Sequence, residues 1–231
     1  MRILIIRPAA LGDTLLLAPV LSNSCEWGEV IVAGRKPGID FLRPLVSGCL
    51  DFEGPGWHGL FMDIPEPGIA LPVRNADKIL AFLQDPQGIV RRNLERLFPG
   101  ASVVVLPGYP AEHESVHVAL YLARALRING FPVDADRAIR EATERPLLRS
   151  SHRSGLRIVF HPGSGGAQKN HPPEFWLDLL WAFRDRIAST QRAPMILLGP
   201  AEEKFLPLFS EKKDVEVLFC PDTEKLALLL E

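Results

Sequence analysis

Cysteine is scarce in this 231-residue chain, and the three that occur, Cys25, Cys49 and Cys220, lie far apart. No Cys-x-x-Cys pair or mixed Cys/His ligand spacing is present, which argues against a zinc site or a disulfide framework and favours a reducing compartment. An excess of one charge is also missing, because 26 Lys and Arg face 28 Asp and Glu, for a formal net charge of −2. Dedicated nucleic-acid-binding domains usually carry a strong basic excess, so we expect no nucleic-acid partner.

Long apolar runs are missing as well. No segment of the sequence approaches the roughly 20 apolar residues that a membrane-spanning helix needs. The N-terminal run Ile3–Ile6 is too short for the core of a signal peptide. The composition therefore favours a cytoplasmic protein. Hydrophobic residues make up 47% of the chain, which is enough for a packed core.

What the chain contains is an alternation of short apolar strands and amphipathic helices. Strands are predicted at Ile3–Ile6, Val30–Ala33, Ser102–Leu106, Arg157–Phe160, Met195–Leu198 and Val215–Phe219. Helices are predicted at residues 11–20, 41–46, 77–84, 88–98, 114–126, 174–187, 202–209 and 223–230. This alternation predicts an α/β fold with parallel sheets covered by helices.

The alternation is interrupted once. Residues 128–154 carry Pro, Asp, Arg and Ser with little periodicity, which is typical of an interdomain linker. A new strand then begins at Arg157. We therefore expect two Rossmann-like domains, an N-terminal one over residues 1–150 and a C-terminal one over residues 151–231.

The first candidate site follows the first strand. Gly12 lacks a Cβ and lets a ligand approach the backbone closely. Asp13 lies at the start of the first helix, where it is either a helix cap or a general base that removes a proton from an acceptor hydroxyl. Arg7, Arg35 and Lys36 stand at strand ends of the same domain and are candidates for binding an acidic acceptor.

The second candidate site is the loop His161–Lys169, which reads His-Pro-Gly-Ser-Gly-Gly-Ala-Gln-Lys. Gly163 and Gly165 free the backbone, Ser164 offers a hydroxyl, and Lys169 offers a point charge suited to a phosphate. Neither a GxGxxG dinucleotide fingerprint nor a GxxxxGK[ST] phosphate loop matches this chain. An ordinary glycine-rich turn stays open as the alternative.

A third piece is the strand tip Leu198-Gly-Pro-Ala-Glu202. Glu202 is placed to recognise a ribose hydroxyl pair or a ring nitrogen. Taken alone, the segment favours a glutamate that complements the dipole at a helix N-terminus. Ligands in open α/β sheets bind at the carboxyl ends of strands, so all three segments stand where a site is expected.

These segments resemble the glycosyltransferase family 9 heptosyltransferases. The resemblance rests on Ile3–Leu21, with its Gly-Asp-Thr turn, and on His161-Pro-Gly-Ser-Gly, Lys169, Pro173-Glu-Phe-Trp and Leu197-Leu-Gly-Pro-Ala-Glu202. It implies a GT-B-like fold, in which an N-terminal domain takes the acceptor and a C-terminal domain takes the nucleotide sugar. The middle of the chain, roughly Cys49 to Arg149, matches only in its rhythm of elements.

The resemblance also implies roles for single residues. The catalytic Asp of the family falls on Asp13, its donor-phosphate hydroxyl on Ser164 and its phosphate-binding Lys on Lys169. Its nucleotide-contacting Glu falls on Glu202, or on the adjacent Glu203 if the register shifts by one. The family also has an Asp-Ser/Thr-Gly…His segment after the next strand, which would come after Glu231. We therefore expect either a fragment of a longer enzyme, with an incomplete second domain, or a degenerate member. Asn170 stands where the family usually has Trp.

The resulting expectation is a metal-independent, inverting glycosyltransferase without a cofactor. It would move a heptose or another sugar, with ADP-heptose as the expected donor, to a lipid-linked acidic saccharide of the lipopolysaccharide core. Such an acceptor implies peripheral contact with the cytoplasmic face of the inner membrane. Two alternatives stay open: a non-catalytic nucleotide-sugar-binding module, and a different sugar-nucleotide enzyme such as an epimerase.

Overall fold

The computed structural model describes residues 1–64, 68, 70–144, 158–163, 167–183 and 193–230. The chain divides into two compact units, Met1–Leu147 and Leu148–Glu231, which are treated one at a time below.

Unit 1 is built on a five-stranded parallel sheet. Its strands are β1 (Arg2–Arg7), β2 (Glu29–Gly34), β3 (Gly48–Asp51), β4 (Lys78–Phe82) and β5 (Ser102–Leu106), in the spatial order β3-β2-β1-β4-β5. All four pairings are parallel. The central strand β1 is buried from Ile3 to Arg7, which explains its uninterrupted apolar sequence, because a parallel strand is covered on both faces.

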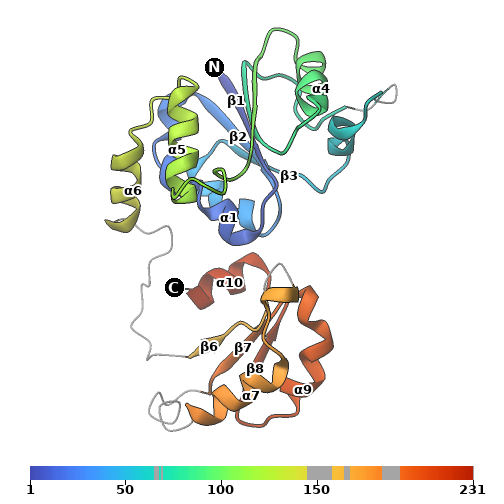
Figure 1. Cartoon of the computed structure of the whole chain (residues 1–231), viewed down its shortest axis with the longest axis vertical. Helices are drawn as coiled ribbons and strands as arrows, with labels where there is room; N and C mark the ends of the chain where they lie inside the picture. The colour runs from blue at the N-terminus through green and yellow to red at the C-terminus, as the bar shows by residue number, and fades with distance from the viewer. Residues whose placement is uncertain (65–67, 69, 145–157, 164–166, 184–192, 231) are drawn as a thin grey trace. The chain divides into compact units, whose positions relative to one another are not determined.

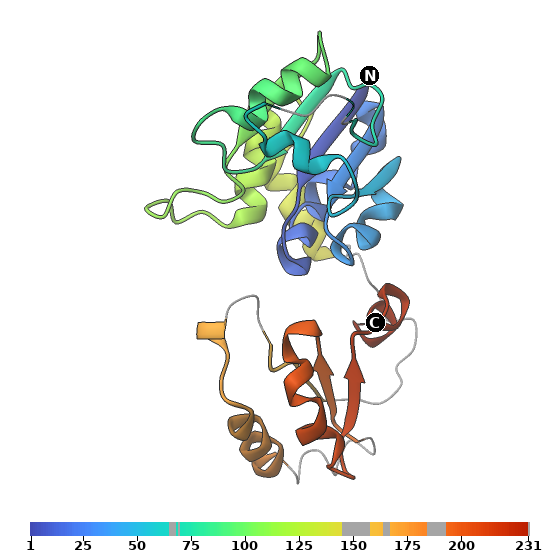
Figure 2. The same ribbon diagram turned by 90° about the vertical axis from the view of Figure 1, so that its right-hand side faces the viewer.

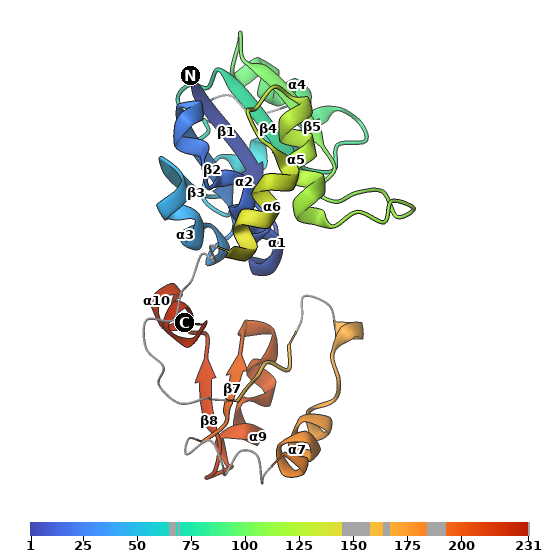
Figure 3. The ribbon, with the colours of Figure 1, turned by 90° about the vertical axis from the view of Figure 1, so that its left-hand side faces the viewer.

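Short helices cover the two faces of this sheet. They are α1 (Leu11–Leu15), α2 (Ala18–Leu21), η1 (Ser24–Trp27), α3 (Gly38–Leu42), η2 (Arg43–Leu45), η3 (Trp57–Phe61), α4 (Ile89–Leu97), α5 (Val118–Ile128) and α6 (Ala135–Glu144). On one face lies α5 (Figure 3), and its Leu122 and Leu126 share a core with Ile3 and Ile5. On the other face, η3 and α4 form the cover (Figure 2), and Leu94 of α4 shares a core with Leu4 and Ile6.

The strand β4 corrects the prediction of a helix at residues 77–84. Leu80 and Phe82 lie in the core on the α5 side, whereas Ile79 and Ala81 lie in the core on the α4 side. This alternation is that of a strand buried on both faces. In a run of only five apolar residues, periodicity does not tell a buried strand from a buried helix. Here the segment is a strand because it pairs with β1.

The helix α6 corrects the prediction that the linker begins at Ile128. Phe131, Val133 and Ala135 are buried in the core of unit 1, and α6 packs against α5 and α2. Asp134 caps the helix by accepting a hydrogen bond from the Arg137 amide at 3.0 Å. Residues 145–154 of the predicted linker lie outside the described residues.

Unit 2 has a smaller parallel sheet with the order β6-β7-β8, formed by β6 (Val159–Phe160), β7 (Met195–Leu198) and β8 (Glu216–Phe219). Its helices are η4 (Ala167–Lys169), α7 (Pro173–Ala182), η5 (Pro200–Phe205), α9 (Leu206–Ser210) and α10 (Thr223–Leu230) (Figure 1). The core gathers Leu180, Ile196, Leu198 and Phe209.

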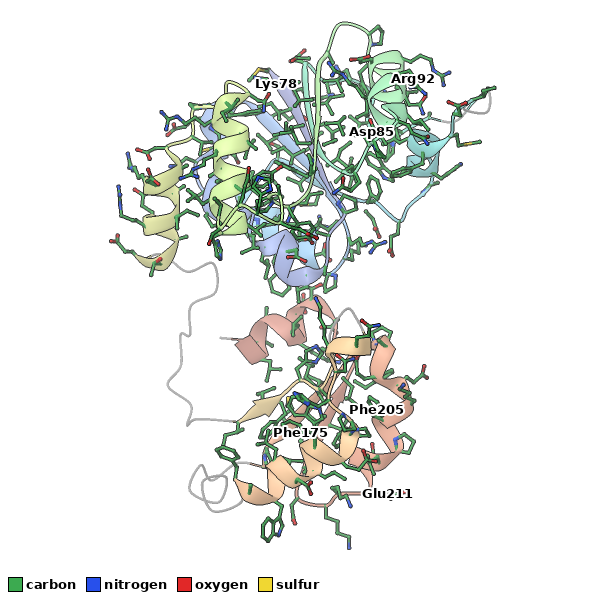
Figure 4. The ribbon with its side chains drawn as sticks, in the orientation of Figure 1. Lys78, Asp85, Arg92, Phe175, Phe205 and Glu211 are labelled. Carbon is green, nitrogen blue, oxygen red and sulfur yellow. The ribbon has the colours of Figure 1, made fainter. Side chains whose placement is uncertain are left out.

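The helix α7 begins one residue before its predicted start, at Pro173, and Phe183 ends it. Residues 184–187 of the predicted helix are not among those described. Phe175 on α7 stacks on the ring of His171, with 4.2 Å between centroids (Figure 4). The fold class is thus confirmed: an α/β chain with two parallel sheets, the second smaller than the first.

Within the described ranges, no helix has the length and apolar character that crossing a membrane requires.

Candidate functional site

Asp13 is the third residue of α1, directly after the carboxyl end of β1. Ala10 occupies the N-cap position of this helix, and no side chain caps it. The helix-cap interpretation of Asp13 is therefore wrong. The half-buried carboxylate instead accepts a hydrogen bond at Oδ2 from the hydroxyl of Tyr109, at 2.9 Å.

Tyr109 lies in the loop after β5, two strands away from β1 in the sheet. Its side chain is 47% exposed. Partial burial raises the pKa of the phenol above its ordinary value, and the contact with Asp13 raises it further. The sequence pattern predicted a loop here, but Tyr109 was not among the candidate residues. The available signal was its rarity, because the chain contains only two tyrosines.

Arg7 connects the turn that contains Asp13 with the loop that contains Tyr109. Its Nε donates to the carbonyl of Asp13 at 3.1 Å, and its Nη1 donates to the carbonyl of Gly108 at 2.7 Å. The guanidinium lies over the rings of Phe82 and Tyr109, at 5.8 and 5.4 Å from their centroids. Burial lowers the pKa of this group.

The burial of Arg7 corrects its expected placement. The residue is 1% exposed, so it is covered by protein instead of facing a bound acceptor. Its Nη2 atom is buried and has no hydrogen-bond partner among the residues that the structure describes. Arg7 therefore supports the Asp13 turn from inside the fold.

The other candidates for acceptor binding are exposed. Gly12 lies on the surface of α1, and a Cβ built there would project into open space. Arg35 and Lys36 follow Gly34, which pairs with Arg7 in the sheet, so they lie at the same carboxyl edge. Arg35 forms an ion pair with Glu53 at 3.1 Å, and both partners are more than half exposed.

In unit 2 the structure brings Gly163 and Glu202 together. Gly163 follows β6 and Glu202 follows the neighbouring strand β7. A Cβ on Gly163 would stand 2.0 Å from Cδ of Glu202, so the carboxylate occupies the space that a side chain would take. Glu202 is 3% exposed, and its Oε2 accepts a hydrogen bond from the Gly199 amide at 2.9 Å.

This geometry gives Glu202 a structural role in addition to any ligand contact. The bond to Gly199 caps the N-terminal turn of η5, which is the alternative that the sequence left open. The remaining oxygen, Oε1, lies 2.2 Å from the site of the missing Gly163 Cβ. The carboxylate therefore stands against bare backbone at the strand ends, where ligands of such sheets bind.

Lys169 ends η4 and is exposed. Ser164 and Gly165 fall outside the described residues. His161, at the start of the same loop, joins its Nδ1 to the carbonyl of Leu197 over 2.9 Å and so ties the loop to β7.

Among the described residues, no group of three or more His, Cys, Asp or Glu side chains is placed to hold a metal ion.

A scan against models of protein families finds no match, and neither does a comparison with curated proteins. Solved structures do match, and they are a heptosyltransferase and a glycosyl transferase of family 9. The E. coli heptosyltransferase WaaC with ADP matches with a TM-score of 0.60 and 19% identity, over 100% of this chain and 78% of that chain. WaaC with ADP-2-deoxy-2-fluoro heptose matches with a TM-score of 0.59 and 20% identity, over 100% and 80%.

A family 9 glycosyl transferase from Veillonella parvula matches with a TM-score of 0.59 and 13% identity, over 94% of this chain and 69% of that chain. Together these matches confirm the resemblance at the level of the fold.

Proposed function

We propose that this chain is an inverting glycosyltransferase that moves a heptose from ADP-heptose to an acidic saccharide of the lipopolysaccharide core. The observation that carries the proposal is the Asp13 carboxylate, which does not cap its helix and is held at the carboxyl edge of the sheet by Tyr109. Two of the matching solved structures contain ADP or an ADP-heptose analogue, which supports a nucleotide-sugar donor.

In this proposal Asp13 acts as the general base. Its carboxylate removes the proton of an acceptor hydroxyl, and the oxygen attacks the anomeric carbon of the donor from the face opposite the diphosphate. The new glycosidic bond forms as the bond from carbon to phosphate oxygen breaks, and the nucleoside diphosphate leaves with the electron pair. Attack from the opposite face inverts the anomeric carbon, and Asp13 ends the step protonated.

Unit 1 would take the acceptor. Exposed Arg35 and Lys36 suit the phosphate and carboxylate groups of an acidic saccharide. A glycine inside a helix lowers its stability, and beyond its own turn no atom of a described residue lies within 4 Å of the Cβ site of Gly12. We therefore assign to Gly12 the close approach of the acceptor, and to Arg7 the support of the turn. Such an acceptor would bring the protein to the cytoplasmic face of the inner membrane.

Unit 2 would take the donor. Lys169 would stabilise the departing diphosphate, together with the loop of Gly163, Ser164 and Gly165. Glu202 would contact the nucleoside. A cation and backbone amides can balance the charge on the leaving group without a metal ion.

Ligand-induced stabilisation tests the donor assignment. ADP-heptose, ADP, UDP-sugars and GDP-sugars are added to the chain, and thermal unfolding is followed. At 100 times its Kd, a ligand that binds only the folded state stabilises it by about 2.7 kcal/mol. We expect a rise in Tm with ADP-heptose and ADP. A rise with UDP-sugars or GDP-sugars alone would contradict the assigned donor, and binding without any transfer would favour a binding module.

A further inference from the structure

We propose that Tyr109 is a positioning residue for Asp13. The hydroxyl of Tyr109 orients the Asp13 carboxylate so that it can remove a proton from the acceptor. This inference rests on the proposed role of Asp13 as the base. The contact joins residues that are 96 positions apart in the chain and is made at 2.9 Å between Tyr109 Oη and Asp13 Oδ2. A base that is itself oriented by a third group is a recurrent arrangement in enzymes that activate a hydroxyl.

The loop that carries Tyr109 is anchored on the residues just before it. The hydroxyl of Tyr121, on α5, donates to the carbonyl of Pro107 at 2.9 Å. Arg7 donates to the carbonyl of Gly108 at 2.7 Å. Two consecutive carbonyls are therefore fixed from two different elements, which restricts where the Tyr109 side chain can reach.

One buried side chain also fixes the distance between the two turns. Arg7 bonds the carbonyl of Asp13 through Nε and the carbonyl of Gly108 through Nη1. A guanidinium is planar and rigid, so two bonds from one group set the spacing of their acceptors. Arg7 thus holds the backbone of Asp13 and that of Gly108 at a fixed distance from each other. Its guanidinium does so beside Phe82, the last residue of β4.

The chemistry of the contact suits an orienting group. Asp13 raises the pKa of Tyr109, partial burial raises it more, and Arg7 opposes both. The phenol therefore stays protonated at neutral pH and donates its proton to Oδ2. In the part of the chain that the structure describes, no other side chain is hydrogen-bonded to this carboxylate, which leaves Oδ1 to take the proton of the acceptor.

Nuclear magnetic resonance of the whole chain labelled at Tyr Cζ tests the contact without any substrate. Only two tyrosine signals exist, and the variants Tyr109→Phe and Tyr121→Phe assign them. We expect Tyr109 to titrate above the ordinary value of 10.0 and to titrate at lower pH after Asp13→Ala. A midpoint that does not respond to Asp13→Ala, in a variant that folds, overturns the proposal.

Kinetics then test the role. With ADP-heptose as donor and heptose-free lipopolysaccharide as acceptor, Tyr109→Phe should lower kcat roughly 10-fold, a fraction of the roughly 10²–10⁴-fold that a general base contributes. The KM for ADP-heptose should stay the same, because the donor residues belong to unit 2. Tyr121→Phe also deletes a hydroxyl but leaves Asp13 Oδ2 bonded, so its loss of kcat should be smaller.

A wild-type kcat in Tyr109→Phe would overturn the positioning role even if the titration shows the contact. A wild-type chain that binds ADP-heptose and transfers nothing would overturn the proposed function and the catalytic purpose of Tyr109 with it. In that case the titration still decides whether Tyr109 holds Asp13, so the two failures are distinguishable.

Discussion

The two units hold their candidate residues in different ways. In unit 1, Asp13 is held by side chains, because Tyr109 bonds its carboxylate and Arg7 bonds its backbone. In unit 2, Glu202 stands where Gly163 leaves out a side chain. In the first arrangement a side-chain hydroxyl fixes one carboxylate oxygen, whereas in the second a backbone amide, that of Gly199, holds one oxygen and the missing side chain of Gly163 makes room for the carboxylate. We infer that unit 1 orients its carboxylate through other side chains, whereas unit 2 places its carboxylate against backbone.

The largest effect is expected from Asp13→Asn, which tests whether the oriented carboxylate of unit 1 acts as the base. The amide keeps the size and can still accept a hydrogen bond from Tyr109, but it does not serve as a base. Turnover should fall by roughly 10²–10⁴-fold, while the free energy of unfolding and the affinity for ADP-heptose stay near wild type. Steady-state kinetics and chemical denaturation measure these quantities, with Asp136→Asn on α6 as the control. Near-normal turnover of Asp13→Asn would contradict its role.

The equivalent test of unit 2 is Lys169→Ala. Loss of one charge-assisted hydrogen bond to a phosphate should cost about 1.5–3 kcal/mol of donor affinity. Isothermal titration calorimetry with ADP-heptose measures it. Lys212→Ala is the matched control, because Lys212 is also exposed but precedes β8 and so lies at the opposite end of the strands. Equal affinities of the two variants would show that Lys169 is only a surface charge.

A double-mutant cycle tests whether Gly163 and Glu202 act together in unit 2. In Gly163→Ala the new Cβ displaces the carboxylate of Glu202, which is the flexible end of its side chain. We expect Gly163→Ala and Glu202→Gln to weaken ADP-heptose binding several-fold each, and the double variant to lose little more than either one. Contacting residues are not additive, and the coupling is expected to be about 0.5–3 kcal/mol. Fully additive losses would separate the two residues functionally.

The smallest effect is expected from Gly12→Ala. Among the described residues outside its own turn, no atom is near enough to clash with the new methyl group, and alanine lowers the entropy of the unfolded chain. The free energy of unfolding should rise by about 0.4–1 kcal/mol. Turnover should fall, since the methyl group enters the space assigned to the acceptor. A variant that is both more stable and fully active would remove Gly12 from the site.

Local sequence signals predicted much of the fold. The apolar run Ile3–Ile6, the glycine-rich loop after Phe160 and the helix at Thr223–Leu230 are visible in the sequence because each depends on its own residues. Strand β4 was wrongly predicted as a helix. Its short apolar run fits either element, and its pairing with β1 and β5, which makes it a strand, is not visible in the local sequence.

The site was predicted less completely. Asp13 and Glu202 were proposed from their positions after strands, and their roles stay predictions. The role of Arg7 was mistaken because its burial depends on Phe82 and Tyr109, which come from two other strand ends. Tyr109 was missed because its contact with Asp13 spans 96 residues, and no periodicity reports which loops meet at one edge of a sheet. Contacts of this kind depend on the order of the strands in the sheet, which the local sequence does not reveal.

The anomeric configuration of the transferred sugar tests the central claim most directly. The chain is incubated with ADP-heptose and heptose-free lipopolysaccharide, and the linkage in the product is determined by nuclear magnetic resonance. Attack by an acceptor oxygen that Asp13 activates predicts a single product with a configuration opposite to that of the donor. A product that retains the configuration of the donor, or a chain that binds ADP-heptose and forms no product, would contradict the account.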